Sequence, residues 1–455
     1  MDNYGLAAHS FETHSTAKFF MNKVISAEQQ TSELATRLSN TMGMFLLFFS
    51  VIVIIVLYKI VYLLNSDEGI FWYFYSILTG FFLLSRLPLG YFYHDSHARS
   101  AGPARDYPGI SFIIAGKNEE DSIYATIESC MRSDYPGPVE CIVVNDGSTD
   151  GTEAEMQRAV DYYNGYVRLI SFAHNRGKRE GMAVGVIEST HDIIVFVDSD
   201  SFPEPNAVRI LVEHFMDNPE VGAVSGNSGV ENERANLLAK MQASRYAISF
   251  DIFKSAESLF GAVTCCPGCF SAYRRTAVAP VLEAWRNQMF LGTRSTFGDD
   301  RSLTNFVLRT WRVEYCRSAR ATTIVPEKYM KFMKQQIRWK KSWIREGITA
   351  AKFMWRKHPI AAVSFYTNLL LPIFGPLLVA RILYMSFVAG KPETFLVFVA
   401  GTSLMGIAFA AFLNLYERKK YWYCMPLFSL LYALILVWQM PYALFRINDT
   451  RWGTR

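Results

Sequence analysis

Charged residues are scarce in this chain. Asp, Glu, Lys and Arg make up only 19% of its 455 residues, whereas a soluble enzyme usually carries about a quarter. The net charge of +5 is too small to indicate a nucleic-acid partner. Residues 1–42 hold no short apolar core followed by a small-residue cleavage site, so we expect a cytosolic arm and no signal peptide. Since 51% of the residues are hydrophobic, the composition favours a membrane enzyme.

Cysteine is also sparse, and its seven positions form no paired framework. The number is odd, and all seven lie in segments that we place in the cytosol, so free thiols are expected. Cys265, Cys266 and Cys269 look like half of a zinc site, but no second Cys/His pair follows at a zinc-ligand spacing. A structural zinc site is therefore not predicted.

Long hydrophobic runs, by contrast, flank the middle of the chain. Residues 44–64 and 70–93 each suit a helix that crosses a bilayer, which takes about 20 residues, and predict a transmembrane hairpin over 43–93. Residues 359–387 and 394–416 predict two more spans within 359–416. Basic residues border both hairpins on the side of the central region, which places that region in the cytosol. We expect a multi-pass protein of the plasma membrane with about four spans.

Two further segments suit the membrane surface. Residues 326–357 are predicted to form amphipathic interfacial helices, because apolar side chains such as Met333 and Ile337 recur among many lysines and arginines. Residues 421–446 are apolar but are broken by Pro426 and Pro441. We interpret them as an interfacial or re-entrant helix that leaves a cytosolic tail over 447–455.

The central residues 108–325 have a different pattern. Short β-rich runs at 110–115, 140–144, 167–172 and 192–197 alternate with helical stretches at 121–132, 152–163 and 178–189. This rhythm predicts an α/β domain with a mostly parallel sheet and helices on both faces. In such sheets ligands bind at the carboxyl ends of the strands.

Carboxylates follow two of these predicted strands. Asp198 and Asp200 close the apolar run 193–197, and Asp146 follows the run 140–144. Paired carboxylates at a strand end can hold Mg²⁺ or Mn²⁺ together with the diphosphate of a nucleotide-sugar. An Asp-x-Asp triplet alone is usually a solvated loop, but here it follows a buried strand, so we predict a metal site at Asp198 and Asp200.

Three other motifs are candidates for the same site. The backbone at Ala115 and the side chain of Glu119 could contact a nucleotide base, although Glu119 also suits an ordinary first helical turn. Lys178 and Arg179, in a basic turn before a helix, would suit a diphosphate or would form a solvated loop. In the run 298–301, we predict that Asp300 is the catalytic base, with Asp299 and Arg301 in support.

The run 335–339, Gln-Gln-Ile-Arg-Trp, lies on the predicted amphipathic helix. Gln336, Trp339 and Trp343 share one helical face. Indole is a good platform for the apolar face of a sugar ring, and amides can hold its hydroxyls. The alternative is a tryptophan that anchors the helix at the membrane interface.

Together these residues resemble the processive family 2 glycosyltransferases, which include cellulose, chitin and hyaluronan synthases, and they are most similar to the bacterial and vertebrate type of hyaluronan synthase. The likeness rests on the runs 290–292, 297–305 and 335–342 and on the terminal Trp-Gly-Thr-Arg at 452–455. It implies a GT-A type, Rossmann-like cytosolic domain between membrane helices, and UDP-sugars, a growing polysaccharide chain and the bilayer as partners. No obligatory protein partner is implied.

The resemblance also implies roles for individual residues. The nucleotide-sugar would contact Ala115, Glu119, Asp146, Lys178, Arg179, Asp198, Arg338, Trp452, Thr454 and Arg455. The acceptor would contact Cys269, Gln335, Gln336 and Trp339. The tail 452–455 would close over the bound nucleotide.

The sugars are less firmly indicated than the reaction. The run 265–274, with three cysteines, is more like the chitin synthase version, and a capsule synthase that uses glucose and glucuronate shares several of the other motifs. The sequence predicts hyaluronan made from UDP-N-acetylglucosamine and UDP-glucuronate, with these two polymers as alternatives. A polyprenyl-phosphate sugar transferase is a less favoured alternative function. The large central domain argues against a transporter that catalyses no reaction.

Overall fold

The computed structural model describes residues 70–95, 106–415 and 419–449, with isolated positions between 43 and 61. The predicted arm 1–42, most of the first expected span and the tail 450–455 lie outside the described residues. The chain divides into two compact units, Met1–Leu84 and Ser85–Arg455. The second expected span forms helix α2, Ile70–Phe92, which begins in the first unit and ends in the second.

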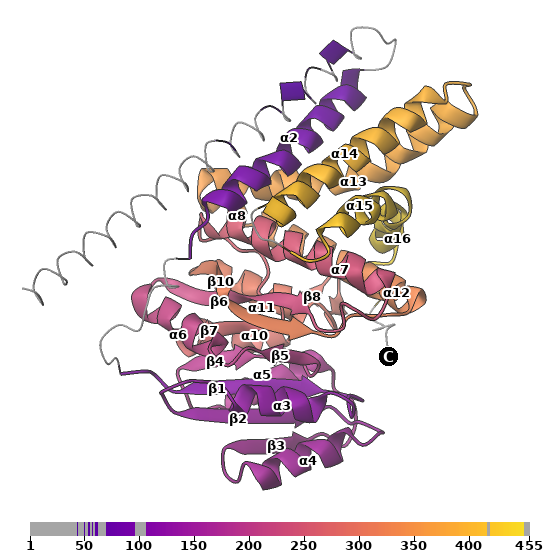
Figure 1. The fold of residues 1–455 in the computed structure, drawn as a ribbon. Helices are drawn as coiled ribbons and strands as arrows, with labels where there is room; N and C mark the ends of the chain where they lie inside the picture. Colours follow the sequence, from indigo (N-terminus) through magenta and orange to yellow (C-terminus); the bar gives the residue numbers. More distant parts are fainter. Residues whose placement is uncertain are drawn as a thin grey trace, which may run out of the picture. The chain divides into compact units, whose positions relative to one another are not determined.

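The centre of the second unit is an eight-stranded sheet with the order β3-β2-β1-β4-β7-β6-β10-β5 (Figure 1). The strands are β1 Ile110–Gly116, β2 Val139–Asn145, β3 Val167–Ser171, β4 Ile193–Phe196, β5 Ser201–Pro203, β6 Val221–Val230, β7 Ser271–Arg274 and β10 Arg312–Thr323. The predicted strands are β1 to β4, which pair in parallel. The sheet then becomes mixed, because β7 pairs antiparallel with both β4 and β6. A separate hairpin joins β8, Met289–Phe290, to β9, Thr293–Arg294.

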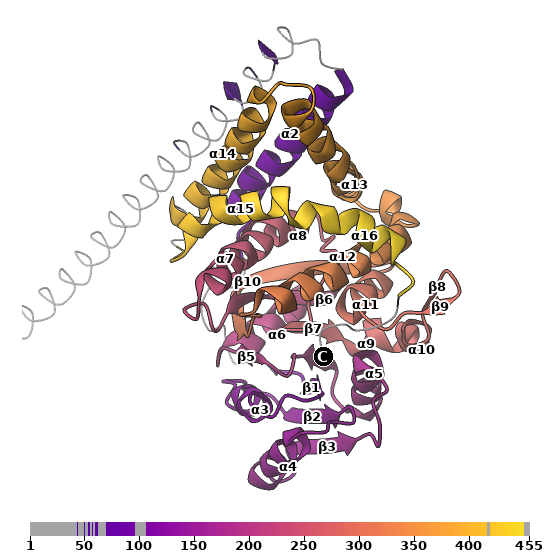
Figure 2. The ribbon, with the colours of Figure 1, turned by 90° about the vertical axis from the view of Figure 1, so that its right-hand side faces the viewer.

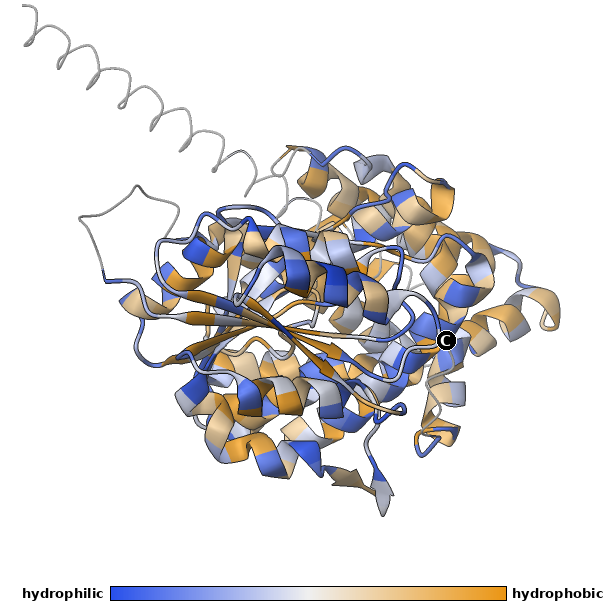
Figure 3. Ribbon diagram, turned by 90° about the horizontal axis from the view of Figure 1, so that it is seen from below, coloured by the Kyte–Doolittle hydropathy of each residue, from blue (hydrophilic) through white to orange (hydrophobic). Residues whose placement is uncertain are grey.

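Helices cover both faces of this sheet, and alternate residues of β1 show how. Ile110, Phe112 and Ile114 pack into the core that includes α3, α4 and α6, whereas Ile113 and Ala115 pack into the core that includes α5 and α11. These helices are α3 Ile123–Met131, α4 Thr152–Tyr162, α5 Lys178–Glu188, α6 Ala207–Asp217 and α11 Asp299–Leu308. Strands buried on both faces need continuous apolar runs, and Figure 3 shows apolar strands between helices of mixed polarity.

A layer of helices separates the sheet from two long apolar helices. The layer contains α7 Leu237–Ala247, the π-helix Ile248–Lys254, α8 Ser255–Ser258 and the 23-residue α12, Tyr329–Ala351. The connection from β7 to α11 holds α9 Arg275–Val278, the 3₁₀ turn Ala279–Val281 and α10 Leu282–Arg286. Figure 2 shows α7 and α12 between the sheet and the apolar helices.

Two helices among the described residues are long and apolar enough to cross a membrane: α13 Pro359–Phe387 and α14 Glu393–Leu415. They match the predicted second hairpin within one residue at each end. The apolar segment after them is bent by 41° between Trp422–Leu434 and Leu436–Phe445. It consists of α15 Met425–Leu434 and α16 Gln439–Phe445, with 3₁₀ turns at Trp422–Cys424 and Leu436–Trp438, and a further such turn, Met354–Arg356, precedes α13. The number of spans stays a prediction.

Candidate active site

The carboxyl ends of β1, β2 and β4 meet at one edge of the sheet. Asp146 follows β2, and its carboxylate accepts hydrogen bonds from the backbone N–H groups of Arg176 (2.6 Å) and Gly177 (3.0 and 3.2 Å). Gly177 has a φ of +95°, which disfavours other residues. Asp146 is 4% exposed. It therefore fixes the turn that starts α5 and sets the position of Lys178.

The loop after β1 is tied to the loop after β2. The Asn118 carboxamide oxygen accepts from the backbone N–H of Thr149 (2.9 Å), and the Glu120 carboxylate accepts from that of Gly151 (2.6 Å). The Glu119 backbone N–H donates to the Thr152 hydroxyl at 2.7 Å. Ala115 is buried within β1. These bonds bring both expected base-reading segments, at Ala115–Glu119 and Asp146, to the same edge.

Lys178 lies among the predicted metal and base carboxylates. Its ammonium group forms an ion pair with Asp198. Burial lowers the pKa of Lys178, but the charges of Asp198, Asp200 and Asp300 outweigh burial and leave the pKa raised. The Asp200 carboxylate accepts from the Thr323 hydroxyl at 3.3 Å. The fold thus gathers two acids from the segment after β4 and one from α11 around Lys178.

Arg179 and Asp299, two other predicted site residues, face the interior instead. Their side chains are 6% and 4% exposed and form an ion pair of 2.7 Å. Arg179 also donates to the backbone carbonyl of Trp285 and to the Gln288 side chain, each at 3.1 Å. Both residues therefore hold α5 against α11, whereas the sequence predicted a diphosphate contact for Arg179.

Asp300, one residue further along α11, is partly exposed. One carboxylate oxygen accepts from its neighbour's backbone N–H, Arg301 N, at 2.7 Å, and the other lies 3.7 Å from the Cys265 thiol. Cys265 belongs to the loop that also approaches Asp198, since a Cβ on Gly268 would lie 2.5 Å from an Asp198 carboxylate oxygen. In the sequence Cys265 suggested only half of a zinc site, and nothing local indicated that it lies beside Asp300.

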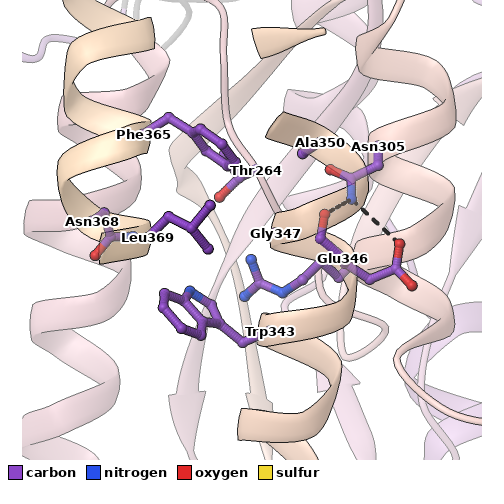
Figure 4. A pocket seen from close by; sticks show the side chains of 10 residues that line it. Thr264, Asn305, Trp343, Glu346, Gly347, Ala350, Phe365, Asn368 and Leu369 are labelled. Atoms are coloured by element: carbon purple, nitrogen blue, oxygen red, sulfur yellow. Dashed lines mark hydrogen bonds between the residues drawn. The ribbon is translucent and has the colours of Figure 1, made fainter. Parts of the chain in front are cut away.

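Arg301 lines a small pocket between α11, α12 and α13. Trp343, Phe365 and Leu369 form its apolar wall, while the Asn305 carboxamide donates to the Glu346 backbone carbonyl (3.0 Å) and carboxylate (3.4 Å) opposite (Figure 4). Burial lowers the pKa of Arg301, but nearby acids, Asp300 among them, raise it overall. Arg301 therefore stays charged next to the predicted base.

The side chains of the run 335–339, on α12, are buried to different extents. Gln336 is 4% exposed. Trp339 is half-buried, with its ring centroid 6.4 Å from that of Tyr246 and 5.8 Å from the Arg245 guanidinium on α7. Gln335 and Arg338 lie on the same helix, α12. Among the acceptor candidates, Cys269 is buried, with its thiol 2.8 Å from the Ser228 hydroxyl. Trp452, Thr454 and Arg455 lie outside the described residues.

One group of three side chains among the described residues could share a metal ion. The ligand atoms of Asp95, His214 and Cys316 lie within 4.8 Å of one another. Each of the three already has a polar contact: the Asp95 carboxylate accepts from Ser318, the Cys316 thiol lies 3.4 Å from the same carboxylate, and His214 Nε2 contacts Glu314 at 2.7 Å. This group shares no residue with the predicted metal pair, Asp198 and Asp200.

Comparisons with known proteins decide the family. The family Glycosyl transferase family 2 matches residues 111–282. A hyaluronan synthase from Streptococcus pyogenes is 31% identical over 416 residues, which cover 90% of this chain and 96% of that protein. The chain belongs to the hyaluronan synthase family.

Other members and neighbours agree with this assignment. Human hyaluronan synthase 3 is 30% identical over 67% of this chain and 55% of its own length. An N-acetylglucosaminyltransferase from Rhizobium meliloti is 34% identical over 59% of this chain and 64% of its own. A mannosyltransferase from Pyrobaculum calidifontis, solved with GDP-Man and Mn²⁺, superposes with a TM-score of 0.55 at 19% identity and covers 83% of this chain and 97% of that one. This hyaluronan synthase relative is thus a glycosyltransferase with the predicted GT-A fold, joined to helices long and apolar enough to cross a membrane.

Proposed function

We propose that the protein polymerises UDP-N-acetylglucosamine and UDP-glucuronate into hyaluronan and passes the polymer out through its own membrane helices. The observation that carries this proposal is the cluster of Asp198, Asp200 and Asp300 around Lys178. Family membership supports the substrates. The catalytic unit would face the cytosol of a cell whose plasma membrane the helices cross, and the product would serve as capsule or matrix.

Each transfer would make one glycosidic bond and release UDP. Asp300 would take the proton of the acceptor hydroxyl, whose oxygen then attacks the anomeric carbon of the donor sugar from the opposite side to the diphosphate. The bond from that carbon to the diphosphate oxygen breaks, and UDP leaves. The configuration at the anomeric carbon is inverted in the new linkage. Lys178 would stabilise the negative charge on the departing diphosphate. Asp146 and the loops after β1 and β2 would hold the uridine.

The donor atoms at Asp198 and Asp200 fit a divalent cation. Both offer carboxylate oxygens, which Mg²⁺ and Mn²⁺ prefer as ligands. The mannosyltransferase of similar fold was solved with Mn²⁺, which supports the use of a divalent ion by this protein. Bound at Asp198 and Asp200, the cation would neutralise charge on the diphosphate.

The decisive experiment supplies membranes or purified protein with each UDP-sugar alone and with both, in the presence of Mg²⁺ or Mn²⁺. We expect a polymer only from UDP-N-acetylglucosamine together with UDP-glucuronate, and digestion of that polymer by a hyaluronan lyase. The similarity to the Rhizobium N-acetylglucosaminyltransferase favours a second candidate, a chitin-type synthase. A polymer from UDP-N-acetylglucosamine alone would establish that candidate, and a product extracted by organic solvent would indicate a lipid-linked sugar instead.

A further inference from the structure

Two cations that have no acidic partner among the described residues lie where the four helices α7, α12, α15 and α16 meet. Arg245 is on α7 and Lys340 is on α12, and α15 and α16 run across both helices (Figure 2). The Arg245 guanidinium lies over the rings of Trp339 (5.8 Å) and Phe428 (6.0 Å). Among the described residues, none accepts a hydrogen bond from this guanidinium or pairs with it as an anion.

Lys340, like Arg245, has no anionic partner among the described residues. It is only 9% exposed, and its ammonium group donates to the Gln439 side-chain oxygen at 3.1 Å and lies 5.2 Å from the Tyr432 ring centroid. No described carboxylate pairs with it. Other buried cations nearby are different: Lys341 pairs with Asp449 at 3.5 Å, and Arg345 pairs with Glu346 at 2.9 Å. An ammonium group has three donors, so Lys340 retains capacity for an acceptor.

The electrostatics of both groups agree with this geometry. Burial lowers the pKa of Lys340 to about 7, and the charge of Arg245 acts in the same direction. Burial also lowers the pKa of Arg245. Buried charges are normally paired, because leaving water without a partner is unfavourable. The two cations are therefore arranged for an anion that this part of the chain does not itself supply.

The surroundings connect this pair with the transfer site. Tyr246, next to Arg245, has its ring 6.4 Å from that of Trp339. Burial raises the pKa of Tyr246, and the charges of Asp200 and Asp198 contribute to the increase. An anion held by Arg245 and Lys340 would thus belong to the same molecule as a ring stacked on Trp339, only a short way from the donor carboxylates.

We propose that Arg245 and Lys340 bind the carboxylate of an acidic sugar in the growing polymer, next to the sugar stacked on Trp339. This inference rests on the proposed function, since it assumes a polymer that contains uronate. Arginine can grip a carboxylate with two hydrogen bonds, and the buried lysine regains its favourable charge when the carboxylate arrives. A chain of neutral sugars would leave both cations unpaired, so the pair selects acidic polymer by penalising the neutral one.

The experiment measures binding without synthesis. Purified full-length enzyme is titrated with a hyaluronan hexasaccharide and with the same hexasaccharide after its carboxylates have been reduced to alcohols. We expect the acidic form to bind about tenfold more tightly or better, because hydrogen bonds to charged groups are among the stronger ones. Arg245→Gln and Lys340→Met should each bring the two affinities within about threefold. Lys334→Met, which removes an exposed lysine from the same helix, should leave the preference unchanged.

Equal binding of both oligosaccharides by the unaltered enzyme would overturn the inference, even if that enzyme makes hyaluronan. Conversely, a failure to make polymer from the two UDP-sugars would remove the proposed function but would leave this binding comparison intact. Vesicles with and without an anionic phospholipid test the other source of an anion. If the two variants lose only their binding to the anionic vesicles, the site holds a lipid headgroup and the proposal is wrong. Thermal unfolding of each variant checks that it is folded.

Discussion

Asp299 and Asp300 are neighbours in the sequence, but their surroundings give them different tasks. Asp299 is buried in an ion pair with Arg179, whereas Asp300 is partly exposed beside Cys265, and its charge helps to raise the pKa of Lys178. A carboxylate that accepts a proton must be accessible to the acceptor hydroxyl, and of these two side chains Asp300 is the partly exposed one. The pair shows how a positioning residue and a predicted catalytic residue can lie one position apart.

The first prediction separates the base from the metal ligand. Asp300→Asn removes the proton acceptor but keeps size and hydrogen bonding, so turnover should fall at least about 100-fold with UDP affinity unchanged. Asp200→Asn should weaken the binding of UDP in the presence of Mn²⁺. UDP release and UDP titration measure the two effects. An equal loss of UDP affinity in both variants would contradict the division of roles.

A second prediction concerns the free energy of unfolding, which the buried ammonium group of Lys340 lowers. Its pKa falls from 10.5 to about 7 in the folded protein. The unfolded chain therefore binds more protons between these values, and stability rises with pH across this window. The unfavourable contribution is complete below pH 7. Lys340→Met should raise the free energy of unfolding by about 1 kcal/mol at pH 6, and by less at pH 9.

Unfolding midpoints of purified protein at the two pH values measure this effect. Lys334→Met, an exposed lysine on the same helix, serves as the control and should show no pH-dependent gain. A Lys340→Met variant that is less stable at pH 6 than the unaltered protein would mean that the ammonium group has an anionic partner.

At the scale of elements, the join between α11 and α12 controls where Asp300 lies. Gly298 precedes α11 with a φ of +73°, and a Cβ there would lie 1.9 Å from the Ser342 hydroxyl oxygen on α12. Gly298→Ala must therefore push α11 away from α12. We expect activity to fall more than about tenfold, because a displacement of about 1 Å is enough to misplace a catalytic group.

Two further variants identify the cause. Gly165 also has a positive φ, +88°, but a Cβ there would meet nothing within 4 Å. Gly165→Ala should therefore show only backbone strain, about 1 kcal/mol of stability, with activity retained. Adding Ser342→Gly to Gly298→Ala should restore part of the activity. If the double variant is no better than the single one, steric contact with α12 is not the reason.

The predicted tail, residues 447–455, is attached to α12 near its start, and its predicted gating role can be tested by deletion. Lys341 on α12 contacts Asp449 through the backbone carbonyl (3.4 Å) and the carboxylate (3.5 Å). Asp449, near the start of the predicted tail, is therefore held by a lysine that lies two positions after Trp339 on α12. Deletion of residues 452–455 should cut polymer synthesis by more than about tenfold while the protein stays folded in the membrane. Unchanged turnover after this deletion would exclude the gating role.

At the scale of the whole molecule, the sequence predicts local features well and distant contacts poorly. The strands β1 to β4 and the helices α13 and α14 were predictable, because apolar runs and their spacing depend on neighbours in the chain. The position of Asp198 and Asp200 at the edge of the sheet followed from strand-end geometry, whereas Asp300 was singled out by its own motif before a predicted helix. Arg179 was assigned to the diphosphate because its buried partner, Asp299, is 120 residues away. Arg245 was missed because nothing local distinguishes it from a solvated helical arginine.

A buried charge joins the region that carries the sheet to the end of the long apolar helix α14. Asp251, in the π-helix after α7, is fully buried, and its carboxylate lies 2.8 Å from the Lys419 ammonium group just beyond α14. Asn227 donates to the same carboxylate at 2.9 Å. An internal anion with one cation is sensitive to the loss of that cation, since removing one partner of a buried pair costs about 3–5 kcal/mol.

Lys419→Met should therefore destabilise the protein by about 3 kcal/mol and loosen the α14 end from the catalytic region. Lys420→Met is the matched control, because Lys420 is exposed and lies 5.2 Å from the Tyr421 ring, and its loss should change stability by less than about 0.5 kcal/mol. Adding Asp251→Asn to Lys419→Met should recover much of the loss, since the unpaired charge is gone. Thermal unfolding in detergent measures all four proteins. Equal midpoints for the two lysine variants would show that Asp251 does not depend on Lys419, and that packing alone joins the membrane helices to the catalytic region.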